Sequence, residues 1–157
     1  PVPAQELTAH DHAIIRQQHL RALRHSANQI FVEMGRVLQL AYAREDWREL
    51  GYSSFASYTE DTLGKSKSES YDLLRIARIA DTYPELEPRI LDAGVSNMRT
   101  VLPEIKDETD YRQVEQWVDT AAVNTWRELQ AVVREEPQYS RQRPAITCPH
   151  CGGIFEI

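Results

Sequence analysis

Apolar side chains recur at helical spacing through most of the chain, and strand-like alternation is almost absent before the last ten residues. The longest pattern runs from about residue 8 or 11 to about residue 43, without proline and with one internal glycine, Gly35. Its apolar positions follow alternating steps of three and four: Leu20, Leu23, Ala27, Ile30, Met34, Val37 and Ala41. This heptad spacing predicts one long helix, or two helices with a break near residues 25–28.

The two halves of this long helix differ in character. Phe31, Leu38 and Tyr42 widen the apolar stripe in the second half, which is typical of a helix packed on a globular core. The first half has a narrower stripe and carries arginine and histidine residues. We therefore expect the first half to project from the domain, where it could pair with a second copy of the chain. The alternative is that it folds back on its own domain.

Residues 51–80 have the start and stop signals of a helix, a tight turn and a second helix. Ser53 or Ser54 is suited to cap the first helix, and Gly64 is placed to end it in a left-handed conformation. Ser66 and Glu69 form an S-x-x-E capping box at the start of the second helix, which runs to about Ala80. Two helices joined this tightly predict a helix-turn-helix of the kind found in many DNA-binding proteins.

The second of these helices has an apolar face toward the expected core and a polar, partly basic face on the other side. A recognition helix needs this arrangement, with phosphates meeting its N-terminal end and side chains reaching base edges. The candidate DNA-binding residues are Lys65, Lys67, Ser68, Tyr71, Arg75 and Arg78. The alternative for Arg75 and Arg78 is a solvated surface, or ion pairs with Glu69 or Asp72.

Two positions depart from a standard helix-turn-helix. The position that usually holds a small residue for close helix approach falls at Glu60, and Lys65 occupies a position that is usually apolar. Ala56 or Ser57 provides the close approach if the register differs.

The segment from about residue 30 to residue 80 resembles a known family. The residues are E-M-G-R-V-L-Q-L-A at 33–41, then Trp47, then F-A-S-Y-x-x-x-x-L-G-K-S-K-S-E-S-Y-D-L-L-R-I-A at 55–77. They are similar to a helical family of unassigned function in phages, prophages and plasmids, which pairs a G-R-x-L helix and a tryptophan with a helix-turn-helix. The resemblance implies a mobile-element protein that acts on DNA or on a DNA-bound machine, and it implies no catalytic residue.

The remainder divides into three parts. Residues 83–136 predict short amphipathic helices that complete the core, broken near Pro84, Gly94 and Pro103. Trp117 and Trp126 are expected inside the core, with an interaction face as the alternative. Residues 137–146 are polar, contain two prolines and predict a linker. The expected domain organisation is therefore a long helix in 1–50, a helix-turn-helix in 51–82, further helices in 83–136, the linker, and a small unit in 147–157.

The last eleven residues contain Cys148 and Cys151 in a Cys-Pro-x-Cys-Gly sequence, which is typical of a zinc-knuckle β-hairpin. Two thiolates make only half of a tetrahedral structural zinc site. The other two ligands would come from a second copy in a dimer, from sequence beyond Ile157, or from histidines. A free or redox-active dithiol is the alternative, although a thioredoxin-like role lacks its βαβ context.

Composition bounds the function. The 157 residues allow one core, and the net charge of −6 argues against non-specific coating of nucleic acid. The charge is uneven, however, because residues 64–80 carry a local charge of +2 and residues 103–120 are acidic. No apolar run is long enough for a membrane helix and no signal peptide is visible, so we expect a cytoplasmic protein without membrane contact.

Two functions from different classes fit these patterns, and no nucleophile–base pair or phosphate loop suggests an enzyme. The first is a sequence-specific DNA-binding accessory or regulatory protein of a phage or mobile element, working as a homodimer in transcription, partition or recombination control. The second is a protein-binding adaptor or inhibitor that docks on a DNA-processing machine such as a polymerase or recombinase, with its acidic surface as the active face.

Overall fold

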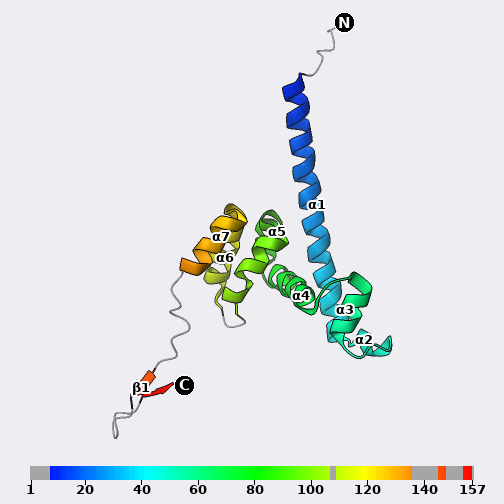
Figure 1. The fold of residues 1–157 in the computed structure, drawn as a ribbon, viewed down its shortest axis with the longest axis vertical. Coiled ribbons are helices and arrows are strands. Elements are labelled where there is room, and N and C mark those ends of the chain that lie inside the picture. Colours follow the sequence, from blue (N-terminus) through cyan, green and yellow to red (C-terminus); the bar gives the residue numbers. More distant parts are fainter. Residues whose placement is uncertain (1–7, 107–108, 136–144, 148–153, 157) are drawn as a thin grey trace.

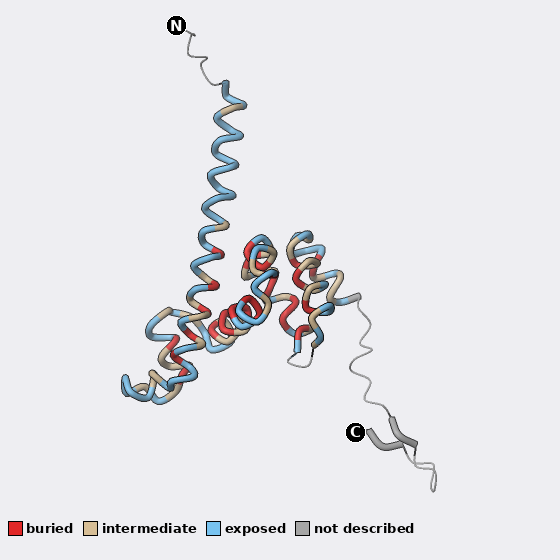
Figure 2. The backbone as a smooth tube through the Cα atoms, turned by 180° about the vertical axis from the view of Figure 1, so that it is seen from behind, coloured by how far each residue is buried: buried red, intermediate tan, exposed pale blue. Residues whose placement is uncertain are grey.

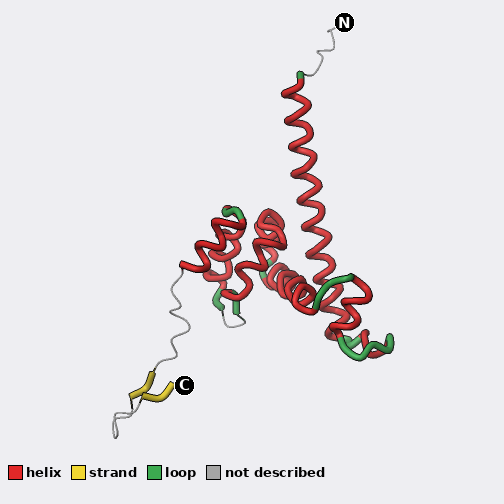
Figure 3. Tube along the Cα trace, viewed as in Figure 1, coloured by secondary structure: helices red, strands yellow, loops and turns green. Residues whose placement is uncertain are grey.

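A computed structural model describes residues 8–106, 109–135, 145–147 and 154–156, and this part of the chain is mainly helical, as predicted (Figures 1 and 3). Its helices are α1 (Ala9–Ala43), α2 (Asp46–Glu49), α3 (Phe55–Leu63), α4 (Lys67–Thr82), α5 (Glu87–Val101), α6 (Tyr111–Val123) and α7 (Trp126–Glu135). Two 3-10 turns, η1 (Pro84–Leu86) and η2 (Leu102–Glu104), flank α5. Strands β1 (Ala145–Thr147) and β2 (Ile154–Glu156) pair antiparallel. Cys148 and Cys151, the expected zinc ligands, lie outside the described residues.

Helix α1 is one continuous helix, without the break considered near residues 25–28. Thr8 caps it, and Thr8 and Asp11 form a reciprocal capping box that satisfies two amides of the first turn. The first half of α1 stands away from the other helices, and residues 9–24 are exposed apart from the half-buried Asp11 (Figures 1 and 2). The chain therefore adopts the projecting arrangement and not the folded-back one.

The second half of α1 crosses α4 at very close range because Gly35 lies at the crossing. A Cβ atom at this position would be 2.7 Å from the Ala77 Cβ, far inside van der Waals contact. Next to it, the Arg36 guanidinium binds three carboxylates, those of Glu33, Asp81 and Glu87. Hydrogen bonds to these carboxylates, that of Glu87 foremost, raise the pKa of Arg36. The G-R pair of the G-R-x-L motif thus joins α1 to the end of α4 and the start of α5.

Helix α4 lies at the centre of the fold. It packs against α1 on one side and against α5 on another, and seven of its sixteen residues are buried. The main core, in which Ile76 and Ala80 of α4 meet residues of α5, α6 and α7, includes Leu86, Met98, Val118 and Leu129. A second cluster holds α3 and the end of α1 against the first half of α4 through Leu38, Phe55, Leu73 and Leu74. The buried residues lie mostly in the packed helices and in the second half of α1, and none lies in residues 8–27 (Figure 2).

The C-terminal helices confirm the breaks expected near Pro84, Gly94 and Pro103 and correct one expected burial. Gly94 has a left-handed φ of 76° inside α5, so the backbone breaks where the sequence predicts. Trp117 is half-buried against the core, as expected. The expectation that Trp126 is a core residue is wrong, because this residue is 53% exposed. It is the first residue of α7, and Leu129, three residues later, points into the core instead.

Candidate nucleic-acid interface

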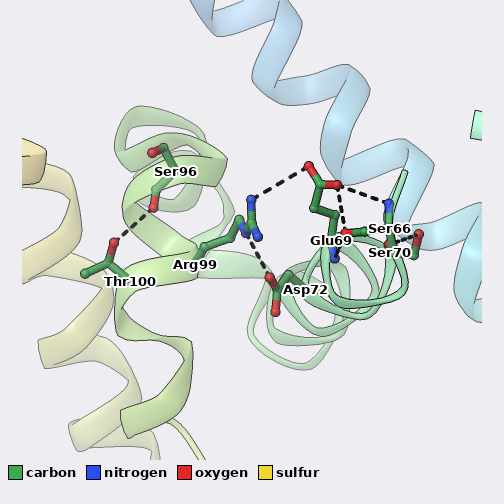
Figure 4. Close-up of polar contacts among 7 residues, drawn as sticks. All are labelled: Ser66, Glu69, Ser70, Asp72, Ser96, Arg99 and Thr100. Atoms are coloured by element: carbon green, nitrogen blue, oxygen red, sulfur yellow. Dashed lines mark hydrogen bonds and ion pairs between the residues drawn. The ribbon is translucent and has the colours of Figure 1, made fainter. Parts of the chain in front are cut away.

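The turn between α3 and α4 is built as the sequence predicts. Ser54 caps α3 in a capping box with Ser57. Gly64 ends α3 with φ 62° and ψ 24°, a left-handed conformation that costs glycine little because it has no Cβ. Ser66 caps α4, where its hydroxyl and amide both bind the Glu69 carboxylate (Figure 4). The first turn of α4 is therefore fixed in place by its own sequence.

The contact between α3 and α4 explains the two departures from the helix-turn-helix pattern. The residues that α3 buries are Phe55 and Thr59, so the register differs by one position from the one that placed Glu60 at the contact. Glu60 is exposed. The Lys65 ammonium lies 5.6 Å from the centre of the Phe31 ring, which makes a half-buried lysine favourable at a position that is usually apolar.

Three of the candidate residues lie in the turn before α4 and in its first turn. Lys67 and Ser68 are exposed, and Lys65 is half-buried with its charged end over Phe31. The ammonium of Lys67 lies 6.0 Å from the centre of the Tyr71 ring. The arrangement presents two cations and a hydroxyl at a helix N-terminus, where backbone amides also favour negative charge.

Tyr71 belongs to an aromatic cluster rather than to a free surface. Its ring makes edge contacts with Tyr42 at 5.8 Å and with Phe55 at 5.6 Å between ring centres. Burial, together with the neighbouring Tyr42 hydroxyl, raises the pKa of Tyr71. The side chain is only half-buried, and the nearby Lys67 ammonium places part of Tyr71 beside Lys67.

Arg75 occupies a different place from the one that the helical wheel indicates. Its Nη2 donates to the carbonyl oxygens of Leu102 and Ile105, at 2.8 and 2.7 Å. Leu102 is the first residue of η2 and Ile105 directly follows it, so Arg75 joins α4 to the η2 turn. Its guanidinium is consequently turned toward the fold and is no part of the free surface at the start of α4.

Arg78 lies one turn further along and is exposed. It lines a small pocket of about 130 Å³ together with Arg75 and Lys106, away from the first turn of α4. The six candidate residues therefore fall into two groups. Lys65, Lys67, Ser68 and the edge of Tyr71 lie together, while Arg75 and Arg78 face the turn after α5.

Glu69 and Asp72, the two acids in the first half of α4, pair with Arg99 of α5 and not with Arg75 or Arg78. Arg99 Nε lies 2.8 Å from Asp72 Oδ2, and Arg99 Nη1 lies 3.9 Å from Glu69 Oε1 (Figure 4). The Ser66 hydroxyl and amide lower the pKa of Glu69. Arg99 thus neutralises part of the negative charge that follows Lys65 and Lys67. Lys65 also acts on the Glu69 carboxylate through its charge, whereas Lys67 forms no ion pair among the described residues.

Sequence reasoning missed an apolar groove on the other side of α3. The groove has a volume of about 500 Å³ and lies between α1 and α3. Its apolar lining comes from Ile30, Met34, Val37 and Leu38 of α1 and from Tyr58 and Leu63 of α3. The heptad pattern of α1 predicts the apolar residues on the α1 side of the groove. The residues on the α3 side could not be predicted, because they depend on how α3 packs beside α1.

The described residues contain neither a cluster of metal-ligating side chains nor a membrane-spanning helix. Within them, no group of three or more His, Cys, Asp or Glu side chains converges on one point. None of the described helices has the length and apolar character needed to cross a membrane.

Comparison with known proteins gives no family for this chain. No family model matches it, and no curated protein or solved structure matches it.

Proposed function

We propose that this chain is a sequence-specific DNA-binding accessory or regulatory protein of a phage or other mobile element, active as a homodimer. The observation that carries the proposal is the start of α4, where Lys65, Lys67 and Ser68 lie together at a capped helix N-terminus. The acids that follow them are held by Arg99. The resemblance to phage and plasmid proteins agrees with this function.

In the proposed complex, the α3–α4 turn approaches the major groove with the N-terminal end of α4 leading. Lys65 and Lys67 neutralise phosphates, and Ser68 with the edge of Tyr71 meets base edges. The middle of α4 stays inside the fold, because α1 and α5 cover it. One such contact surface is small, so specific binding requires two copies on two half-sites.

The C-terminal cysteines extend the proposal to a metal. Cys148 and Cys151 would hold a structural Zn²⁺ as two of four ligands, with the rest supplied from outside this pair. Such a zinc would stabilise the C-terminal unit and supply no chemistry. Metal analysis of the purified protein beside Cys148→Ser and Cys151→Ser variants tests this part by itself.

The DNA proposal is tested by selection from a random duplex library, followed by binding assays on the enriched sequence. A variant with Lys65→Gln and Lys67→Gln removes both cations from the turn. A control with Arg112→Gln and Arg127→Gln removes the same charge from exposed positions of α6 and α7. We expect wild type and control to enrich one sequence and bind it equally.

The turn variant should bind more weakly, with a slope of log K against log salt that is shallower by about 1.8, because two phosphate contacts are lost. Circular dichroism should show the fold unchanged in both variants. Failure of wild type to enrich any sequence, or equal binding by the turn variant, would contradict the proposal.

A protein-binding adaptor or inhibitor is the second candidate, and the apolar groove between α1 and α3 is the observation that favours it. An adaptor of a DNA-processing machine such as a polymerase or recombinase would form a stable complex with that protein. It would show no sequence enrichment in the library selection.

A further inference from the structure

The heptad seam of α1 is exposed along most of its length. Leu20, Leu23, Ile30 and Val37 are 67%, 54%, 60% and 64% exposed, although all four are large and apolar. The core-facing residues of α1, such as Val32 and Gly35, lie on another side of the helix. The seam is therefore an apolar stripe that the chain's own core leaves unused.

The first half of α1 also lacks partners for its helical conformation. Residues 9–24 project from the fold, and among the described residues none packs over them (Figures 1 and 2). Helices of this length are marginal in water, since most helical stability in proteins comes from packing of an apolar face. A partner on the seam would supply that packing.

The seam matches itself when two copies run antiparallel. Leu20 then faces Val37, Leu23 faces Met34, and Ala27 faces Ile30 of the other copy, with each residue also taking the reverse role. Every one of these layers joins an a position to a d position, as antiparallel coiled coils require, and a two-fold interface is self-complementary in this way.

The same arrangement places a helix in the groove beside α3. Ile30, Met34 and Val37 belong both to the seam and to the wall of the groove. Opposite them in the antiparallel pair lie residues 20–27 of the other copy, which belong to its projecting half. The groove of about 500 Å³ and the helix without a partner are therefore complementary parts of one surface.

Charge favours the antiparallel direction over the parallel one. Residues 12–25 carry three arginines and no carboxylate. Residues 44–63, which include α2 and α3, carry five carboxylates and two arginines. An antiparallel pair brings the basic half of each copy toward the acidic segment of the other, whereas a parallel pair sets the two basic halves side by side.

We propose that the occupant of this groove is a second copy of the chain, whose projecting half of α1 lies antiparallel along the seam and against α3. The interface supplies the dimer on which the proposed function rests, but it involves none of the residues assigned to DNA. Its failure and the failure of DNA binding are therefore measured separately.

The first test is the molar mass of the full chain, measured by light scattering after gel filtration, with and without EDTA. We expect a dimer in both conditions, because the seam needs no zinc. Ile30→Glu should give a monomer, since it places a charge in the middle of the seam. Ile14→Glu is the matched control, because Ile14 is apolar and exposed on the same helix but outside the a and d positions, and this variant should remain a dimer.

The second test fixes the direction of the pair. Leu20→Cys and Val37→Cys are prepared separately, oxidised alone and as an equal mixture, and the new disulfides are identified by mass spectrometry. An antiparallel pair gives a cross-link between position 20 of one copy and position 37 of the other in the mixture, and little self-cross-linking of either variant. A parallel pair gives the reverse, because each residue then faces itself.

Each remaining outcome overturns the proposal. A monomeric wild-type protein would leave the groove to a different protein. A dimer that dissociates in EDTA would assign the contact to the zinc-knuckle cysteines. An Ile30→Glu variant that stays dimeric, or self-cross-linking of Leu20→Cys, would exclude the antiparallel seam.

Discussion

Gly35 and Leu73 determine how closely the two main helices approach. A Cβ atom at position 35 would overlap the Leu73 carbonyl oxygen and lie 2.9 Å from its carbonyl carbon, and both atoms belong to the backbone of α4. No side-chain rotation relieves such a contact. The close crossing of α1 and α4 therefore depends on this one glycine, and everything that α1 positions depends on the crossing.

Gly35→Ala should consequently destabilise the protein. Alanine favours a helix over glycine by about 1 kcal/mol, but the overlap with α4 forces the helices apart, and overpacking typically costs about 1–3 kcal/mol. We expect a net loss in the free energy of unfolding, measured by urea denaturation followed by circular dichroism. Equal or greater stability of the variant would show that the crossing is looser than described.

Arg75 should matter for stability and Arg78 should not. Arg75→Gln removes two charge-assisted hydrogen bonds to the carbonyl oxygens of Leu102 and Ile105. A hydrogen bond of this kind contributes up to about 3 kcal/mol to the free energy of unfolding. Arg78 is exposed, so Arg78→Gln should change the free energy of unfolding by less than about 0.5 kcal/mol. Urea denaturation of both variants measures the contrast.

The same pair of variants separates a structural arginine from a DNA-binding one. If Arg75 contacts DNA, Arg75→Gln should weaken DNA binding at temperatures where the variant is fully folded. Because the Arg75 guanidinium is bonded to η2, we predict that Arg75→Gln leaves DNA binding unchanged at those temperatures.

Asn28 should be needed for the break in α5. The left-handed backbone at Gly94 interrupts the helix, so carbonyl groups in the preceding turn lose helical partners. Asn28 Nδ2 donates to one of them, the Leu91 oxygen, at 2.8 Å in a buried position. Asn28→Leu leaves that oxygen unsatisfied and should cost about 1–3 kcal/mol.

The control for this change is Gln18→Leu, the same exchange of an amide for an aliphatic side chain at an exposed position of α1. Its effect on unfolding should stay within about 0.5 kcal/mol. Equal effects of the two variants in urea denaturation would mean that the bond to Leu91 contributes nothing.

The capping carboxylate of Glu69 predicts a pH dependence of known sign. Bonds from Ser66 hold its pKa below the usual 4.5, so the ionised form is favoured in the folded state. Its contribution to stability is present above pH 4.5 and is lost as the pH falls through the lower folded value.

Glu69→Gln removes this titration while keeping a side chain that accepts the same bonds. The urea midpoint of the variant should lie below that of wild type at pH 7, and the two midpoints should converge on acidification. Other carboxylates titrate in both proteins, so only the difference between the two curves is informative. A constant difference at every pH would show that Glu69 has an ordinary pKa in the fold.

Local sequence signals were sufficient for the longer helices and most of their ends, although they did not predict the short α2. Gly64, Ser66 with Glu69, and Gly94 act within a few residues of themselves, because caps and left-handed turns depend on backbone geometry and the nearest side chains. The heptad seam was equally readable, since its period belongs to the helix itself. The DNA-binding, dimer and zinc hypotheses remain predictions that these signals raise.

The partners of long side chains were decided by the tertiary structure. A helical wheel placed Arg75 on the free face, but its guanidinium donates to the carbonyl oxygens of Leu102 and Ile105, 27 and 30 residues later in the chain. The sequence also predicted Trp126 as a core residue, but in the folded chain Trp126 is exposed and Leu129 is buried. The α1–α3 groove likewise depends on tertiary structure, because its walls come from two helices that are distant in the sequence.

The sequence by itself therefore determined the longer helices of the described residues, most of their ends, and which stripe of α1 is apolar. Only the tertiary structure decided which polar groups are free and which face of α1 remains uncovered. The physical reason is range: caps and periodicity are properties of neighbouring residues, whereas burial and pairing depend on which distant segments the packing brings together.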